Sequence, residues 1–282
     1  MSKQTTIKKE VSVQGVGLHT GKESKIVFKP ARADEGIVFV RVDLPNKPHI
    51  KAVVKNTLAS QAVRGSVIAN GDATVYTIEH IMASVSALGI DNLIIEIDSA
   101  EPPILDGSAL GFAGVLDEAQ VTELEAAKKY LTLAQPISVS FGVSRYWAYP
   151  CDHFEIDATI GFDHPLLKMQ HLAIPEINRD VFLKEIAPAK TFCFDYEIES
   201  LLANNLGKGG NMSNAIVIGL DGIHNEEPLR FKDEFVRHKI LDLIGDLYLA
   251  GHSIKAQVVV DKPGHKNNIH FVEELLKKAV LV

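Results

Sequence analysis

The sequence holds only two cysteines, Cys151 and Cys193, which is too few for a disulfide framework. Its 29 lysines and arginines are outnumbered by 36 aspartates and glutamates, and no block of basic residues offers a binding surface for nucleic acid. No apolar run approaches the roughly 20 residues that span a bilayer, and the polar start MSKQTTIKKE lacks the apolar core of a signal peptide. We therefore expect a soluble, cytoplasmic protein without a nucleic-acid partner.

A length of 282 residues, with 46% hydrophobic residues, is comfortable for two globular domains. Periodicity and turn signals predict the elements of the first half. They are strands within 7–60, a helix over 77–90 with Thr77 as N-cap, a strand over 92–98, a turn over 101–109 and a helix over about 111–128. The charged segment ELEAAKKY, at the end of that helix, is the candidate linker.

The second half repeats this order of elements. Its pattern predicts strands in 131–141 and 153–162, a helix over 237–252, a strand over 255–261, a turn over 263–268 and a helix over 271–280. Residues 190–220 interrupt the repeat with a strand, a short helix, a Gly-rich turn and a strand. We predict an α+β protein of two similar domains, 1–127 and 128–282, each a strand-rich sheet with two helices, the helices sandwiched between the sheets.

The helix RHKILDLIGDLYLAGH carries His238, Asp242 and Asp246 at i, i+4 and i+8, which places them on one face. One interpretation is that this face is solvated. The other is a metal site, because catalytic zinc takes a close pair of ligands, one distant ligand and a water. Gly245 costs roughly 1 kcal/mol relative to alanine unless a neighbouring backbone comes close. The adjacent like charges of Asp242 and Asp246 favour a nearby cation, which a metal or His238 itself would supply.

The remaining histidines are candidates for the third ligand. His80 is favoured because Glu79 precedes it in the first turn of a predicted helix, where a carboxylate is stabilised. One turn of helix would then deliver a ligand and a general base, although the pattern alone favours an ordinary N-terminal helix charge for Glu79. His19 and His265 lie in glycine-flanked loops that could face the same site, and spacing alone does not choose among them.

Six segments together resemble, in order, those of a known enzyme family. They are GVGLHTGK (15–22), TIEHIMASVSALGIDN (77–92), EPPILDGSA (101–109), KTFCF (190–194), RFKDEFVRHKILDLIGDLYLAGH (230–252) and PGHKNN (263–268). The family is the UDP-3-O-acyl-N-acetylglucosamine deacetylases, zinc amidases that catalyse the committed step of lipid A biosynthesis. The resemblance covers essentially the whole chain.

This resemblance implies a role for each matched position. The zinc ligands would be His80, His238 and Asp242, and iron(II) is possible in the same site. The base that takes a proton from the attacking water would be Glu79. The oxyanion would be held by the metal and the hydroxyl of Thr191. As an imidazolium, His265 would stabilise the oxyanion or protonate the departing amine, with Asp246 as the partner that raises its pKa.

The resemblance also implies where the substrate lies. The insert 190–220 matches an acyl-binding tunnel, lined by position by Leu18, Phe192, Ile198, Met212 and Val217. Lys239 would reach a sugar or phosphate oxygen, Phe162 would stack on uracil and Lys262 would meet the diphosphate. The implied partner is a small molecule, an acylated UDP-sugar, and the implied assembly is a monomer.

Two other functions share some of these features. A non-haem iron oxygenase also uses two histidines and a carboxylate, but usually as H-x-D on strands, whereas the pair here is H-x-x-x-D on a helix. A non-catalytic nucleotide-sugar-binding protein would need no base beside a metal, so Glu79, Thr191 and His265 argue against it.

Overall fold

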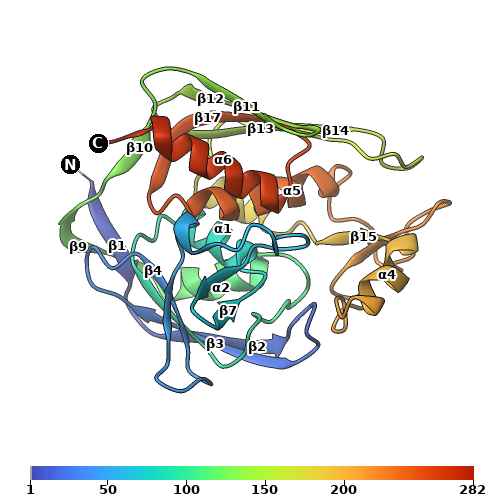
Figure 1. Ribbon diagram of the computed structural model, residues 1–282, viewed down its shortest axis with the longest axis horizontal. Coiled ribbons are helices and arrows are strands. Elements are labelled where there is room, and N and C mark those ends of the chain that lie inside the picture. The colour runs from blue at the N-terminus through green and yellow to red at the C-terminus, as the bar shows by residue number, and fades with distance from the viewer. Residues whose placement is uncertain (1) are drawn as a thin grey trace.

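Two β-sheets face each other across a layer of helices (Figure 1). The structure is a computed structural model that describes residues 2–282. One sheet runs in the order β2 (Val11–Val16), β3 (Glu23–Pro30), β8 (Leu93–Ile97), β4 (Ile37–Arg41) and β5 (His49–Lys51). The other runs β11 (Ile137–Phe141), β12 (Ser144–Pro150), β17 (Ser253–Asp261), β10 (Tyr130–Thr132) and β18 (Val280–Leu281), with β13 (Phe154–Ile160) on β17 and β14 (Gln170–Ile174) on β13.

Short strand pairs and short helices complete the chain. The pairs are β1 (Lys3–Ile7) with β9 (Val121–Ala127), β6 (Ile68–Asn70) with β7 (Ala73–Val75), and β15 (Phe192–Phe194) with β16 (Ile216–Ile218). The short helices are η1 (Val54–Asn56), α3 (Arg179–Val181), η2 (Phe182–Ile186), η3 (Asp195–Glu197) and α4 (Ile198–Ala203). The predicted insert keeps its expected order of strand β15, helix α4, glycine turn and strand β16.

The layer between the sheets contains α1 (Glu79–Ala87), α2 (Leu110–Glu118), α5 (Glu234–Tyr248) and α6 (His265–Lys278). Alternation explains how each sheet covers this layer, since every second residue of a strand points to the same face. In β17 the residues Ile254, Ala256, Val258 and Val260 are buried, and the residues between them are partly exposed. The α+β prediction, with helices between two sheets, is confirmed. No helix in residues 2–282 combines the length and apolar character needed to cross a membrane.

Helix α5 is buried along almost its whole length, so its polar stripe is not a solvated face. His238, Asp242 and Asp246 are 3%, 2% and 0% exposed. Helices α1 and α5 cross at Gly245, where an added Cβ atom would overlap the carbonyl oxygen of Glu79. The close backbone approach expected from a glycine in mid-helix is therefore confirmed.

The helix predicted over 111–128 is wrong beyond Glu118. The chain turns at Gln120, which has a φ of 59°, and continues as strand β9 antiparallel to β1. Glu and Ala favour helix, but pairing with β1 overrides that propensity and is supported by an ion pair of 2.8 Å between Lys3 Nζ and Glu125 Oε1. The segment predicted as a linker therefore begins inside a paired strand.

Two further local predictions are wrong. Thr77 is not an N-cap: its φ is 54°, its hydroxyl donates to Glu101 Oε1 at 3.1 Å, and α1 begins after Ile78 without a side-chain cap. The turn predicted over 263–268 is mostly helix, because α6 begins at His265. The first turn of α6, HKNN, has no apolar pattern, so the sequence did not indicate a helix there. His265 and Asn268 in this turn are nevertheless buried.

Candidate active site

Helices α1 and α5 bring three potential metal ligands together. His80 Nε2 lies 3.7 Å and His238 Nε2 lies 3.5 Å from Asp242 Oδ1, and the three ligand atoms all lie within 4.8 Å of one another. Nitrogen and oxygen ligands of a tetrahedral zinc ion are about 3.4 Å apart, given bond lengths of about 2.0–2.2 Å. The three side chains therefore fit one divalent cation without rearrangement of either helix.

The protonation states of these side chains suit a cation. Burial and the neighbouring His238 lower the pKa of His80 to about 3, and burial lowers the pKa of His238, so both imidazoles are neutral. Burial opposes ionisation of Asp242, but the charges of Lys239 and His265 lower the pKa of that carboxyl overall. His238 Nδ1–H donates to the carbonyl oxygen of Ala189 at 3.0 Å, which turns Nε2 toward Asp242.

Glu79 lies beside these ligands at the start of α1. Its Oε2 accepts a hydrogen bond of 2.8 Å from the backbone N–H of Ser66. Burial raises the pKa of Glu79 to about 7, and the nearby Asp242 and Asp246 act in the same direction. A carboxyl group that titrates near neutral pH is suited to accept a proton during catalysis.

His265, at the start of α6, faces the same site. Its Nδ1–H donates to Asp246 Oδ2 at 2.9 Å, and its Nε2 lies 3.6 Å from Asp242 Oδ2. Burial lowers the pKa of His265, but Asp246, Asp242 and Glu79 outweigh it and raise the pKa to about 9. His265 is therefore an imidazolium at neutral pH, whereas His80 and His238 are neutral.

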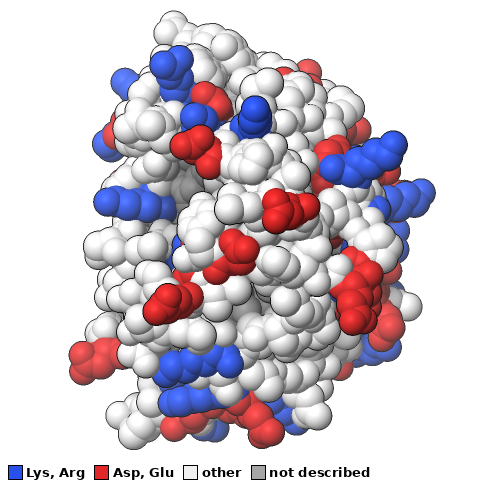
Figure 2. All heavy atoms as spheres, turned by 90° about the vertical axis from the view of Figure 1, so that its right-hand side faces the viewer, with Lys and Arg blue, Asp and Glu red and all other residues white. Residues whose placement is uncertain are grey.

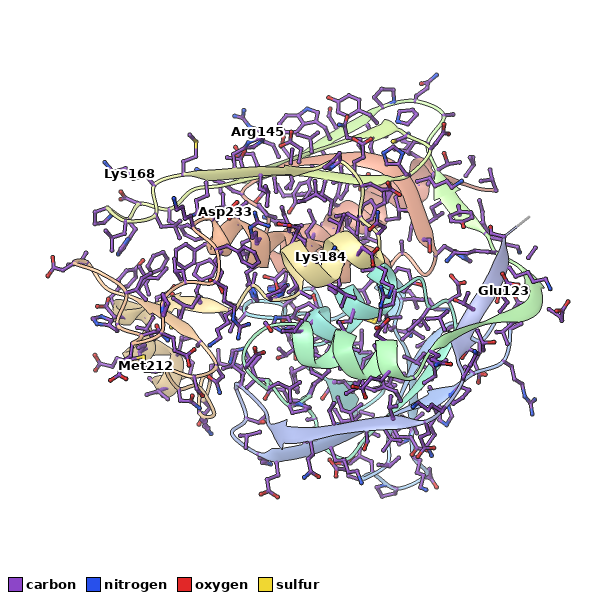
Figure 3. All side chains as sticks on the ribbon, turned by 180° about the vertical axis from the view of Figure 1, so that it is seen from behind. Glu123, Arg145, Lys168, Lys184, Met212 and Asp233 are labelled. Carbon is purple, nitrogen blue, oxygen red and sulfur yellow. The ribbon has the colours of Figure 1, made fainter. Side chains whose placement is uncertain are left out.

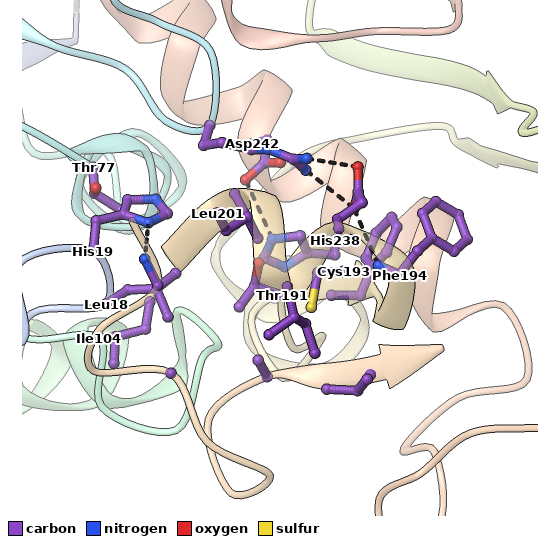
Figure 4. A pocket seen from close by; sticks show the side chains of 18 of the residues that line it. Leu18, His19, Thr77, Ile104, Thr191, Cys193, Phe194, Leu201, His238 and Asp242 are labelled. Atoms are coloured by element: carbon purple, nitrogen blue, oxygen red, sulfur yellow. Dashed lines mark hydrogen bonds and ion pairs between the residues drawn. The ribbon is translucent and has the colours of Figure 1, made fainter. Parts of the chain in front are cut away.

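These side chains open into a cavity of about 500 Å³ that extends to the insert (Figure 4). Its lining includes the candidate catalytic residues Glu79, Thr191 and His265. It also includes most of the predicted substrate contacts, namely Leu18, Phe162, Phe192, Ile198, Met212, Val217 and Lys239. Asp246 lies behind His265 instead, and Lys262 is not part of the lining.

The outer part of the cavity belongs to the insert. Figure 3 shows Met212 on the insert, and this lining residue is 50% exposed. Lys239 Nζ donates to Asp242 Oδ2 at 2.7 Å. The ammonium group that was predicted to contact the sugar or a phosphate is therefore paired with a candidate metal ligand.

Seen from the insert side, charges of both signs are interspersed on the surface (Figure 2).

Sequence reasoning missed several residues that hold the site. The hydroxyl of Ser66 donates to Asp246 Oδ1, and Asn268 Nδ2 donates to Asp246 Oδ2 at 2.8 Å. Glu101 is fully buried and accepts the backbone N–H groups of His19 at 2.9 Å and Thr20 at 2.7 Å. The sequence signal for Glu101 was its place beside the apolar residues of EPPILDGSA, because a carboxylate that is buried with apolar residues needs hydrogen-bond partners.

An ion pair also forms part of the cavity lining. Arg64 lies between η1 and β6, and its Nη2 is 2.6 Å from Glu197 Oε1 in the insert. Both side chains line the cavity, and the bond joins the first half of the chain to the insert. No spacing rule connects residues so distant in sequence, so this contact was not predictable.

Comparison with known proteins gives one consistent family. Residues 4–277 match the family model LpxC, described as UDP-3-O-acyl N-acetylglycosamine deacetylase. A protein of Syntrophotalea carbinolica named UDP-3-O-acyl-N-acetylglucosamine deacetylase is 43% identical over 98% of this chain and 88% of its own length. Proteins with the same name from Geobacter sp. strain M21 and Cellvibrio japonicus are each 42% identical, over 98% and 99% of this chain and 89% and 91% of their own lengths.

Proposed function

The chain belongs to the UDP-3-O-acyl-N-acetylglucosamine deacetylase family, and from this we infer its reaction and the roles of its residues. The protein is a metal-dependent deacetylase of lipid A biosynthesis. It hydrolyses the N-acetyl amide of UDP-3-O-acyl-N-acetylglucosamine to acetate and the free amine. The observation that carries the residue assignment is the convergence of His80, His238 and Asp242 beside Glu79 and His265 in one cavity.

We assign the metal to His80, His238 and Asp242. Two neutral imidazoles and a carboxylate are the donors of many hydrolytic zinc sites, and zinc is the proposed ion, with iron(II) suited to the same donors. When bound, the ion lowers the pKa of a water molecule and polarises the amide carbonyl.

Glu79 is the proposed general base. Its pKa of about 7 leaves a substantial ionised fraction at neutral pH, so the carboxylate takes a proton from the attacking water. The hydrogen bond from the Ser66 backbone fixes Oε2 and leaves Oε1 available for this transfer. The hydroxyl of Thr191, which lines the same cavity, donates to the oxyanion that forms.

His265 is the proposed general acid. Because Nδ1–H is held by Asp246, the proton available to the substrate is on Nε2. This N–H stabilises the oxyanion and then passes its proton to the departing amine. The reaction therefore uses one carboxylate that accepts a proton and one imidazolium that donates a proton.

The insert supplies the proposed acyl-binding surface. Apolar side chains line the cavity from Leu18 and Phe192 out to Ile198, Met212 and Val217. Each buried methylene contributes about 0.8 kcal/mol, so ten methylenes contribute on the order of 8 kcal/mol before ordering costs.

Three assignments concern the polar part of the substrate. Lys239 would release Asp242 to bind a sugar or phosphate oxygen, Phe162 would stack on uracil and Lys262 would meet the diphosphate. We also propose that the protein acts as a cytoplasmic monomer. Its halves would be 1–127 and 128–282, which meet between β9 and β10.

An assay of acetate release from the acylated nucleotide sugar tests this proposal. Purified enzyme is stripped of metal, reloaded with Zn²⁺ or Fe²⁺, and assayed with and without O₂. We expect hydrolysis to disappear with the metal and return with either ion, independent of O₂. Turnover that required iron and O₂ would favour an oxygenase, and tight binding without acetate release would favour a binding protein.

A further inference from the structure

A second cluster of metal-binding side chains lies at the start of β13. Cys151 Sγ is 3.1 Å from Glu155 Oε1, and His153 Nε2 is 2.7 Å from the same oxygen. His153 Nδ1 and Nε2 lie 3.7 and 3.8 Å from Cys151 Sγ. A thiol, an imidazole and a carboxylate therefore converge on one point, with ligand atoms all within 4.8 Å of one another.

These separations match the size of a zinc-like ion. With bond lengths of about 2.3 Å to sulfur and about 2.0–2.1 Å to nitrogen, tetrahedral ligands lie about 3.6 Å apart. The distances from Cys151 Sγ to the two nitrogens of the His153 ring agree with this value. The distance from Cys151 Sγ to Glu155 Oε1 is shorter than this value by about half an ångström, and the distance from His153 Nε2 to Glu155 Oε1 is shorter by about 0.9 Å. To admit the ion, the side chains of His153 and Glu155 must rotate apart.

The surrounding groups hold the cluster in place. Gln257 Nε2 donates to Glu155 Oε2 at 3.0 Å, so Oε1 is the oxygen turned toward the thiol. His153 Nε2 lies 3.0 Å from the carbonyl oxygen of Pro175. With Nδ1 as the ligand, and with the ring rotated so that Nε2 leaves Glu155 Oε1, Nε2–H donates to that carbonyl, an arrangement typical of metal-binding histidines.

The cluster is separate from the active site. Glu155 on β13 and Tyr149 on β12 both pair with Gln257, and Gln257 alternates with the buried residues of β17 that face the helices. The cluster therefore lies on the outer face of that sheet. Figure 3 shows Arg145, an exposed residue of β12, pointing outward from the same face. The active site lies on the inner face, beyond the other end of β17.

We propose that Cys151, His153 and Glu155 bind a second, borderline-soft divalent ion such as Zn²⁺, distinct from the catalytic ion. Binding displaces the thiol proton to solvent and leaves thiolate sulfur, imidazole nitrogen and carboxylate oxygen as ligands. His153 is 45% exposed in its side chain, so further coordination positions remain open to water and the ion exchanges with the medium. The ion would tie the crossover between β12 and β13 to the sheet.

Cobalt(II) titration of the metal-free enzyme tests this proposal, because a thiolate ligand gives an intense near-ultraviolet charge-transfer band that a His₂Asp site lacks. We expect wild type to bind two equivalents and to show the band. Cys151→Ser should bind one equivalent without the band and keep its deacetylase activity. His153→Asn should weaken the band and lower the affinity for the second equivalent. This variant tests the site without changing a cysteine.

Two matched variants separate this site from the proposed catalytic one. His238→Ala should lose the other equivalent and the activity but keep the band. Because the band depends on Cys151, it would support the second site even if the assignment of the catalytic ligands were wrong. Cys193→Ser, which changes the other cysteine, should still bind two equivalents and show the band. A wild type that binds a single equivalent, or a band that persists in Cys151→Ser or vanishes in Cys193→Ser, would overturn the second site.

Discussion

Asp246 on α5 and His265 on α6 form a buried pair, with 2.9 Å between carboxylate Oδ2 and imidazole Nδ1. Asp246 is 0% exposed, and its carboxylate also accepts hydrogen bonds from Ser66 and Asn268. The carboxylate is therefore fixed in place, and the imidazolium has one orientation, with Nε2 toward the cavity. This pair links the packing of the helix layer to the proton chemistry of the site.

Asp246→Asn should shift the basic limb of the pH–rate profile to lower pH. The acid form of His265 is required, so activity falls as pH rises through its pKa of about 9, and removing the carboxylate lowers that pKa. The profile of kcat/KM against pH measures the shift. Glu273→Gln, a charge removal on the exposed side of the same helix, should leave the limb in place. An unmoved limb in Asp246→Asn would remove this pair from the mechanism.

Glu79→Gln should reduce the deacetylation rate by roughly a hundredfold or more while metal content stays near wild type. The amide keeps the size of the side chain but cannot accept a proton. In wild type the ionised base is required, so activity should also fall as pH drops through the pKa of about 7, and this acidic limb should vanish in the variant. Steady-state rates and metal analysis on the same preparation check both parts. Unchanged turnover would contradict the role of Glu79.

Gly245→Ala should destabilise the fold by about 1–3 kcal/mol, because an added methyl group would overlap the Glu79 carbonyl and push α1 from α5. The same shift separates His80 from His238 and Asp242, so metal affinity should fall as well. Urea denaturation and metal titration measure the two effects. Gly114→Ala, in α2 with no atom near the added Cβ, should be neutral or stabilising. Equal stabilities of the two variants would contradict close packing at Gly245.

Shortening the acyl chain should weaken substrate binding by about fourfold per methylene, from about 0.8 kcal/mol each. Placing a charge on the cavity wall with Ile198→Asp should flatten that dependence. Leu220→Asp is the control, because Leu220 is 65% exposed and outside the cavity lining. KM values for a series of acyl lengths measure the slope in each enzyme. A steep slope in Ile198→Asp would place the acyl chain elsewhere.

Local spacing predicted the parts of the site that one helix carries. The i, i+4 pair of His238 and Asp242 follows from helix geometry, and Gly245 indicated the close approach of a neighbour. Spacing could not select His80 over the other histidines, because that choice depends on how α1 packs against α5. The family resemblance supplied the choice, and the structure brings the three side chains together.

Tertiary contacts explain what the sequence did not predict. The segment 121–127 is a strand because β1 pairs with it, although its composition favours helix. The start of α6 was predicted as a turn because it is polar. His265 and Asn268 are buried there because they donate hydrogen bonds to Asp246, and a pattern of apolar residues does not reveal such burial. Glu101 and Arg64 act through partners that only the fold brings near.

Anomalous X-ray scattering from crystals of the zinc-loaded enzyme tests the central claim most directly. The account predicts a zinc peak about 2.0–2.2 Å from one atom each of His80, His238 and Asp242, with an open side facing Glu79 and His265. No peak at this position in an enzyme that is active and contains zinc would contradict the proposed catalytic centre, whatever metal is found at Cys151.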